Sequence, residues 1–324
     1  MMKKLKAFTL IEILIALLLS GALSLTLANA LRYISLSSQR AARILLARER
    51  GERVIAFVEQ RILHCAFGLS ACKSNNLFKK ALGSGTGKEL SVLASSSQWP
   101  IIIYQDELSF IPVSETNGVY KGAAFDVIYA QESGLDLKIS NPNIKTLRPG
   151  QSVEYIRLRG DINSSGLESS WKYSDMRSWC VFPAVGVPLH IDSLNSAKNK
   201  IKLTLAASWP EEIKLTPAGS LYRIITERFF VNAEIFKFQR LQNYWGELTS
   251  SGWPRELGIL ALYCEWRPAN KIFDLYILSS GGAAVFNKNS RPEAWPLDAL
   301  WQEDFAGHEL CVSKASWKIE NLNL

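Results

Sequence analysis

The feature that most constrains this chain is one carboxylate at the start of an uncharged segment of membrane length. Glu12 follows a short basic leader, and the 19 residues from Ile13 to Leu31 carry no charge. As a helix this segment spans roughly 28 Å, close to the hydrocarbon thickness of a bilayer. A carboxylate in such a segment costs on the order of 2.5–3.5 kcal/mol on insertion scales, so we expect a nearby cation to stabilise Glu12.

Cleavage of the chain between Ala7 and Phe8 would supply that cation. The new α-amine would be largely protonated at neutral pH, because its pKa is roughly 7.7–8.0. Phe8 and Glu12 are four residues apart and share one helix face, and the amine of a parallel neighbouring helix could also reach Glu12. This arrangement predicts that Glu12 directs assembly.

The segment Lys6-Ala-Phe-Thr-Leu-Ile-Glu12 and the apolar run behind it resemble the N-terminus of type IV prepilins and of the related type II secretion pseudopilins. The family usually has Gly at the position of Ala7. The resemblance implies that a prepilin peptidase cuts between Ala7 and Phe8 and methylates the amine of Phe8, and that Glu12 guides subunits into the filament. Residues 1–7 are then a cleaved leader, and residues 8–31 the transmembrane and filament-core half of a helix.

A cleaved secretory signal is the alternative interpretation of the same segment. Ala28-Asn29-Ala30 fits a signal-peptidase site, and cleavage before Leu31 would release the rest of the chain. The apolar run is longer than a signal core of about 7–15 residues, however, and this interpretation gives Glu12 no role. We favour a membrane anchor, with the leader lysines in the cytoplasm of a bacterium and the bulk of the chain in the periplasm.

Helical periodicity continues beyond the apolar run. Arginines occupy many of the intervening positions, no proline interrupts the pattern, and Gly68 is a plausible terminator. We expect residues 32–68 to extend the same helix, from Phe8 to about Phe67, over roughly 90 Å. The apolar stripe predicted to pack on the rest of the protein is Ile44, Ala47, Gly51, Ile55, Val58, Ile62 and Cys65.

Residues 69–324 have the composition of a β-rich head. All ten tryptophans lie after Gly68, and short apolar or β-branched runs alternate with Gly, Ser, Asn and Pro clusters. The expected fold class is α+β, a long helix packed on a mainly antiparallel head, as one extended domain or two lobes. Ser74–Lys88 and Gly281–Pro296 are expected loops. The expected strands are Ser91–Ala94, Ile101–Tyr104, Phe125–Ala130, Leu135–Ile139, Val153–Leu158, Ile201–Ala206, Leu221–Phe230, Ile259–Trp266, Ile272–Ser279 and Leu310–Trp317.

The positive charge of the chain is concentrated in its N-terminal part. Residues 1–68 hold ten basic residues and four glutamates, which leaves 27 of the 37 basic and 26 of the 30 acidic residues for the head. The head is therefore nearly neutral, and we expect no nucleic-acid partner. The ten tryptophans are expected mostly in the core, although exposed ones would suit an adhesin.

Motifs for catalysis are poor. The three histidines have neither metal-ligand spacing nor a nucleophile motif, and Gly83–Lys88 departs from the phosphate-loop pattern, so we expect no enzyme and no cofactor. Asp161, Asn163 and Ser165 match the opening of a calcium loop, but Lys172 stands where a glutamate would close it. An ordinary turn is the alternative, and we predict no metal beyond this candidate.

Five cysteines cannot all pair within one chain. Cys65 and Cys72 bracket the expected helix end, so a disulfide between them would fasten the helix to the first loop in an exported protein. Buried reduced thiols are the alternative, especially for Cys264 within an apolar run. We leave both interpretations open.

The head carries a more diffuse resemblance, which refines the functional expectation. Ala124–Tyr129, Pro217–Ile224 and the head's length resemble PilW-like minor pilins, which overlap with the J-type pseudopilins of type II secretion. The expected function is a minor pilin of the inner membrane that joins other minor pilins and the major pilin to prime or cap a type IV pilus. The alternatives are a pseudopilin at the tip of a type II secretion pseudopilus and a filament-borne adhesin or ligand-binding head.

Overall fold

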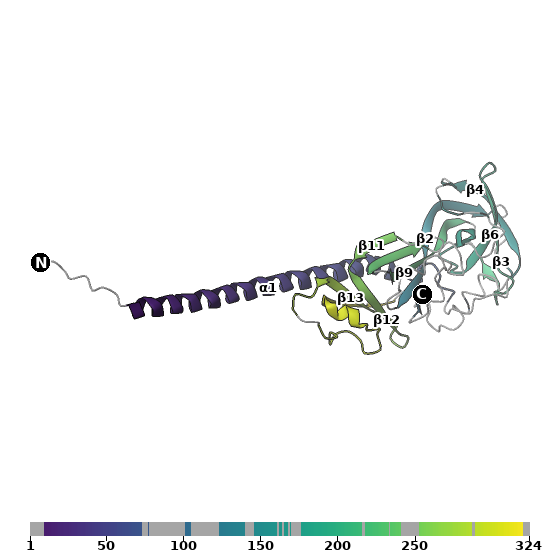
Figure 1. Ribbon diagram of the computed structural model, residues 1–324. Helices are drawn as coiled ribbons and strands as arrows, with labels where there is room; N and C mark the ends of the chain where they lie inside the picture. The colour runs from purple at the N-terminus through teal and green to yellow at the C-terminus, as the bar shows by residue number, and fades with distance from the viewer. Residues whose placement is uncertain are drawn as a thin grey trace.

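One long helix and a β-rich domain make up the fold (Figure 1). Helix α1 runs without a break from Leu10 to Ile62, and its 53 residues extend about 80 Å. The N-terminal half projects away from the sheets, whereas the C-terminal half lies against them. The computed structural model describes residues 10–72, 77, 101–104, 123–139, 146–160, 162–163, 165–167, 169, 176–215, 218–232, 234–240, 253–286 and 289–319.

The helix ends five residues earlier than the periodicity predicts. After Ile62 the chain forms turns, and both Ala66 and Gly68 adopt positive φ values, of 61° and 73°. These turns hydrogen bond to the neighbouring sheet, with Ala66 N donating to Ile128 O at 2.8 Å and Ala130 N donating to Phe67 O at 2.9 Å. Backbone groups beyond the last helical turn are thus satisfied by the head.

In the described part of the chain, the larger sheet has nine strands in the order β1-β2-β4-β7-β6-β5-β9-β10-β11. Because β2 also pairs with β9, the strands β2, β4, β7, β6, β5 and β9 form a closed ring, and the remaining strands extend it past the ring. All the pairings are antiparallel. The strands are β1 Ile101–Tyr104, β2 Ala124–Ile139, β4 Ser152–Arg159, β5 Trp179–Val181, β6 Pro188–Asn195, β7 Lys200–Thr204, β9 Ala218–Asn232, β10 Ile235–Arg240 and β11 Trp253–Leu257.

A second sheet of three strands holds the docked half of α1. It is formed by β12 (Ile259–Arg267), β13 (Ile272–Ala283) and β14 (His308–Lys318), and α1 packs on β13 and β14. The short strands β3 (Thr146–Leu147) and β8 (Ile213–Lys214) pair separately. Two 3-10 helices, Met176–Ser178 and Glu303–Gly307, complete the described elements.

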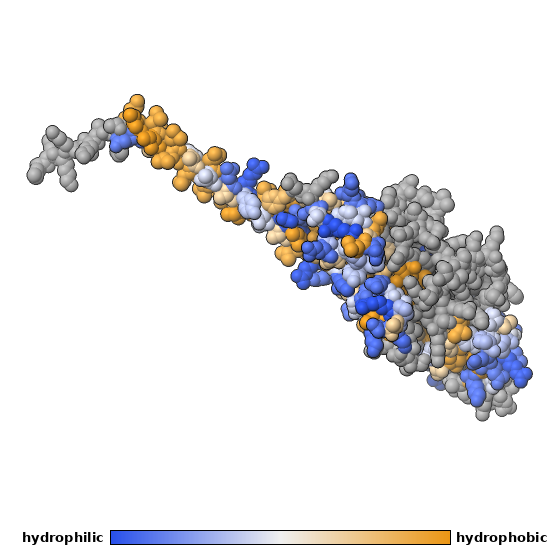
Figure 2. Space-filling view, turned by 90° about the horizontal axis from the view of Figure 1, so that it is seen from below, coloured by the Kyte–Doolittle hydropathy of each residue, from blue (hydrophilic) through white to orange (hydrophobic). Residues whose placement is uncertain are grey.

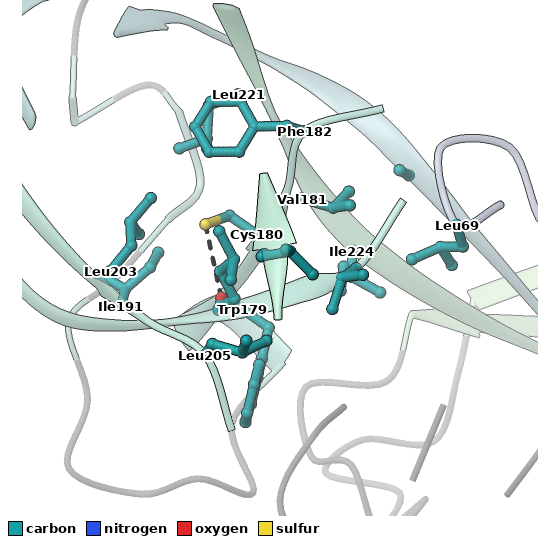
Figure 3. Close-up of a cluster of buried hydrophobic side chains, with 14 of the residues drawn as sticks. Leu69, Trp179, Cys180, Val181, Phe182, Ile191, Leu203, Leu205, Leu221 and Ile224 are labelled. Carbon is teal, nitrogen blue, oxygen red and sulfur yellow. Dashed lines mark hydrogen bonds between the residues drawn. The ribbon is translucent and has the colours of Figure 1, made fainter. Parts of the chain in front are cut away.

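Among the residues that the structure describes, three apolar clusters form the core. One belongs to the closed strand ring, where Trp179, Leu203 and Leu221 are fully buried (Figure 3). Another joins the helix to both sheets and includes Val58 of α1 and Phe229 of β9. A smaller cluster on the three-stranded sheet includes Trp295 and Phe305. The C-terminal half of the helix is therefore part of the hydrophobic core.

The expected α+β class with a mainly antiparallel sheet domain is confirmed. Nine of the ten expected strands overlap observed ones, and Ser91–Ala94 lies outside the described residues, as does Ser74–Lys88 apart from Leu77. Two expected strands are halves of one, because β2 continues through a register shift between Glu132 and Leu135 in which Gly134 adopts φ +75°. The expected loop Gly281–Pro296 starts later than predicted, because β13 extends to Ala283.

Candidate functional site

The first half of α1 is exposed and apolar. All residues from Leu10 to Ser35 are exposed, including Leu17, Leu18 and Leu19. Figure 2 shows hydrophobic surface gathered at the projecting end of the helix and a mixture of hydrophilic and hydrophobic surface over the part that adjoins the sheets. The helix is long and apolar enough to cross a membrane.

Glu12 is the one acidic residue of the exposed half and stands in the first turn of α1. A carboxylate at this position is favourable, because the N-terminal end of a helix carries partial positive charge. The next acidic residue along the helix is Glu49, more than 50 Å away at about 1.5 Å per residue. Ala7 and Phe8, the predicted processing residues, lie outside the described residues.

The second half of α1 docks through the stripe that periodicity predicts. Ala47, Gly51, Val58, Ile62 and Cys65 are buried as expected. Two predicted members, at positions 44 and 55, are only partly covered, and one residue at position 54 is buried without having been predicted. Along the helix the environment changes from exposed at residues 10–35 to buried at residue 47.

Small residues allow α1 to approach the three-stranded sheet closely. A Cβ on Gly51 would overlap the side chain of Ser313, and Ser279 Oγ lies 2.6 Å from the carbonyl oxygen of Ala47. The same hydroxyl lies 3.1 Å from the carbonyl oxygen of Cys311 in β14. Helix and sheet backbones are thus linked through one serine.

Three arginines on one side of α1 reach the sheet, and we call them the arginine cluster: Arg40, Arg43 and Arg50. Arg43 donates to the carbonyl oxygen of Ala283, and Arg50 donates to that of Ser280 at 2.5 Å. Both acceptors lie near the end of β13. The cluster therefore holds the helix at the point where it leaves the domain.

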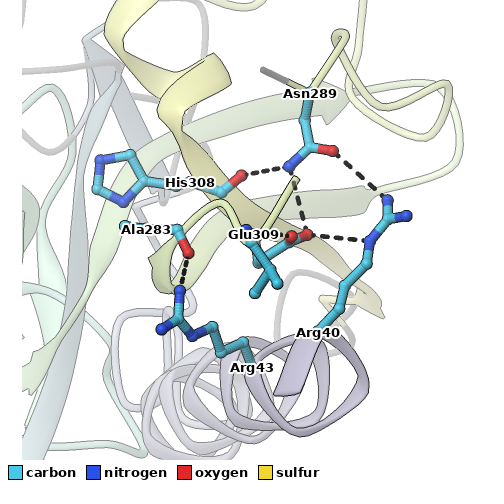
Figure 4. Close-up of polar contacts among 7 residues, drawn as sticks. Arg40, Arg43, Ala283, Asn289, His308 and Glu309 are labelled. Carbon is cyan, nitrogen blue, oxygen red and sulfur yellow. Dashed lines mark hydrogen bonds and ion pairs between the residues drawn. The ribbon is translucent and has the colours of Figure 1, made fainter. Parts of the chain in front are cut away.

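Arg40 binds the carboxylate of Glu309, with 3.3 Å between Nε and Oε2 (Figure 4). The glutamate side chain is only 2% exposed, so its charge depends on partners within the fold. Val285 N donates to its Oε1 at 3.0 Å, and Asn289 Nδ2 donates to its Oε2 at 3.3 Å. A second bond from Asn289 Nδ2, to His308 O at 2.7 Å, orients the amide.

A further group of buried charges lies at the other end of the docked half. Glu227 is 1% exposed and faces Arg240 at 3.0 Å and Arg61 of the helix at 3.6 Å. Tyr129 bonds to the same carboxylate, and burial, followed by the charge of Glu227, raises the pKa of this phenol to about 12. Helix α1 is therefore tied to the nine-stranded sheet by charge as well as by apolar contact.

Cys65 and Cys72 follow the second of the two interpretations that the sequence left open, that of buried reduced thiols. Both residues are buried thiols without a disulfide, and they belong to different apolar clusters. Cys72 Sγ donates to Gly186 O at 3.8 Å. Burial raises the pKa of both thiols, so each is held as a neutral thiol and not as the reactive thiolate.

The candidate calcium residues are only partly described. Ser165 is buried and its hydroxyl donates to Ile162 O at 2.6 Å while accepting from Leu167 N at 3.2 Å, which is the pattern of a local turn. Asn163 is exposed, and Asp161 lies outside the described residues. In the described part of the chain no three His, Cys, Asp or Glu side chains are grouped to hold a metal.

The histidines serve local contacts. His64 Nδ1 lies 2.7 Å from Gln60 O, and His190 Nδ1 lies 3.0 Å from the carboxylate of Asp192. His308 Nδ1 lies 2.7 Å from Ser280 Oγ, beside the arginine cluster. The buried tryptophans at positions 179, 209, 295 and 317 are core residues, as expected from the sequence.

Sequence reasoning missed the contacts of the arginine cluster with β13 and β14. The sequence did carry a signal for these contacts, since arginines recur along residues 40–53, but their partners lie more than 200 residues further along the chain.

The chain matches no protein-family model, no curated protein and no solved structure with which it was compared.

Proposed function

We propose that this chain is a minor-pilin-like subunit, anchored in the bacterial inner membrane before assembly and carried in a type IV filament afterwards. One observation carries the proposal: a single unbroken helix exposes an apolar half of membrane length and docks its other half in the core of a β-rich domain. A subunit built in this way can move its anchor from lipid to a core of packed helices without refolding its head. The leader motif and Glu12 agree with this role.

Glu12 is the proposed register residue. After prepilin peptidase cuts between Ala7 and Phe8, the Phe8 amine of the same or an adjacent subunit supplies a cation for the carboxylate. In the filament, this pair lies within an apolar bundle formed by the N-terminal helices of this subunit, the major pilin and other minor pilins. The arginine cluster keeps the head fixed on the helix while the bundle forms.

The test is Glu12→Ala, with Glu52→Ala as the matched control from the exposed polar part of the helix. Glu12→Ala is expected to retain membrane insertion and cleavage but to enter sheared filaments much less, whereas the control enters normally. N-terminal sequencing of the mature protein should give a methylated Phe8. Normal incorporation of Glu12→Ala would refute the pairing, and a mature chain starting at Leu31 would refute the anchor.

Type II secretion is the competing assignment, because a pseudopilin at a pseudopilus tip needs the same helix. A deletion of the gene separates the two roles. We expect loss of pili and twitching with intact protein secretion. Loss of secretion with normal piliation would overturn the pilus assignment in favour of the pseudopilus.

A further inference from the structure

An aromatic contact lies where the apolar half of α1 meets the head. Phe286, on the connection from β13 to β14, packs against Tyr33 of α1 with ring centroids 6.2 Å apart. Arg40 lies over the Phe286 ring, 5.8 Å from its centroid. Both rings remain accessible, since Tyr33 is 67% and Phe286 is 39% exposed.

The height of this contact along the helix is set by helical geometry. Tyr33 follows the last residue of the uncharged run, Leu31, by two positions, and Arg32 is the first charge after that run. From Leu10 to Tyr33 the helix rises about 35 Å, compared with about 30 Å for the hydrocarbon core and about 40–45 Å for the bilayer with its headgroups. When the apolar half spans the membrane, Tyr33 therefore lies at the level of the headgroups.

The chemistry of the contact suits that level. Tyrosine and other amphipathic rings concentrate at membrane interfaces, and arginine can bind lipid phosphate there while its aliphatic stem stays in apolar surroundings. Arg32 is exposed, and the side chain of Arg40 is 45% exposed despite its bond to Glu309. Phe286 comes from the head, so it brings the sheet domain to the same height as the helix residues.

We propose that Tyr33 and Phe286, flanked by Arg32 and Arg40, form a lipid-facing contact on the periplasmic surface of the membrane. The partner is the headgroup region of a phospholipid bilayer, and the inference rests on the proposed membrane span. Continuity favours lipid over a second protein, because both exposed rings adjoin the exposed apolar half of α1. The connection between β13 and β14 then rests on the membrane, and the subunit stands upright before it enters a filament.

Photo-crosslinking tests the contact in the full chain. Phe286 is replaced by p-benzoylphenylalanine and the protein is reconstituted in vesicles of phosphatidylethanolamine and phosphatidylglycerol that contain a radiolabelled phospholipid. Phe67 is the matched control, because it is also aromatic and 37% exposed but lies beyond the far end of α1. Leu18, in the exposed apolar half, reports the span itself, and Tyr33 provides a second probe of the contact.

We expect lipid adducts from positions 286, 33 and 18 and at least tenfold fewer from position 67. Adducts at position 18 without adducts at position 286 would overturn the lipid contact while leaving the membrane span intact. Adducts at 286 and 33 without adducts at 18 would show that these rings meet lipid although α1 does not span the bilayer, and would overturn the placement of the contact by the span. Equal labelling at 286 and 67 would also overturn the proposal, since it would show unspecific capture.

Discussion

Gly281 of β13 lies directly against the backbone carbonyl of Arg43 on α1, so that a Cβ at position 281 would overlap the carbonyl oxygen. This close approach lets Arg43 reach Ala283 and keeps the helix against the end of the sheet. The obstacle is backbone and not a flexible side chain, so a methyl group can be accommodated only if the helix shifts.

Gly281→Ala should therefore destabilise the folded protein by about 1–3 kcal/mol, the usual cost of overpacking. Chemical denaturation of the detergent-solubilised full chain measures this change. Gly307→Ala is the matched control, because a Cβ there meets nothing within 4 Å. Equal stability of the two variants would contradict the close helix–sheet contact.

The pair Asp126–Arg228 predicts a larger effect. Both side chains are nearly fully buried, and two hydrogen bonds of 2.7 and 2.9 Å join the guanidinium to the carboxylate. Asp126→Ala leaves a buried cation without its main counter-charge and should cost about 3–5 kcal/mol.

The control for this pair is Glu52→Gln, which removes an exposed ion pair with Arg48 and should not change stability measurably. Denaturant titrations of both variants give the comparison. A loss below about 1 kcal/mol for Asp126→Ala would show that water reaches Arg228 in the folded state.

Tyr129 predicts how stability changes at high pH. Its pKa is about 12 in the fold, compared with an ordinary value of 10.0, because burial and the charge of Glu227 disfavour the phenolate. The unfolded chain therefore releases this proton first as pH rises, and ionisation favours unfolding. The contribution of Tyr129 is fully present below about pH 10 and is lost as pH rises toward 12.

Tyr129→Phe removes this group from the titration, so its stability should fall less steeply than that of the native chain between pH 10 and 12. Unfolding midpoints measured in this range give the difference. Other groups that titrate in this pH range, including the buried thiols, are present in both proteins and contribute equally to both slopes. Identical slopes would show that the phenol is not shielded from solvent.

The five cysteines should differ in reactivity. Burial raises the pKa of the thiols at positions 65, 72, 180 and 264 as well as that of the half-buried Cys311. Cys311 is the most accessible of them, so a maleimide at neutral pH should label it first, and all five should react only after unfolding. Mass mapping that finds Cys65 joined to Cys72 would contradict the structure.

Much of the helix was predictable because helical burial repeats every three to four residues. Ala47, Gly51, Val58 and Ile62 follow that period, and their burial confirms it. The end of the helix was not predictable to the residue, because Ala66 turns the chain at a positive φ while bonded to Ile128 of a distant strand. Tertiary contacts determine that boundary.

Strands that lack a continuous apolar run were missed. β6 begins at Pro188 and carries His190 and Asp192, and β11 contains Pro254, which its edge position in the sheet accommodates. The polar contacts of the arginine cluster could not be predicted from local sequence patterns either. Arg40 and Glu309 are 269 residues apart in sequence, and only the closed fold brings them together.

The absence of any interruption in α1 has a mechanical consequence. Between Leu10 and Ile62 the helix has neither a proline nor a break, and its last turns are embedded in the core of the head. The helix is therefore fixed to the head at its C-terminal end, and its N-terminal end moves with the head. A few degrees of rotation of the head therefore displace Leu10 by several ångströms, so that a force applied to the sheet domain is delivered, as torque, to the segment that carries Glu12.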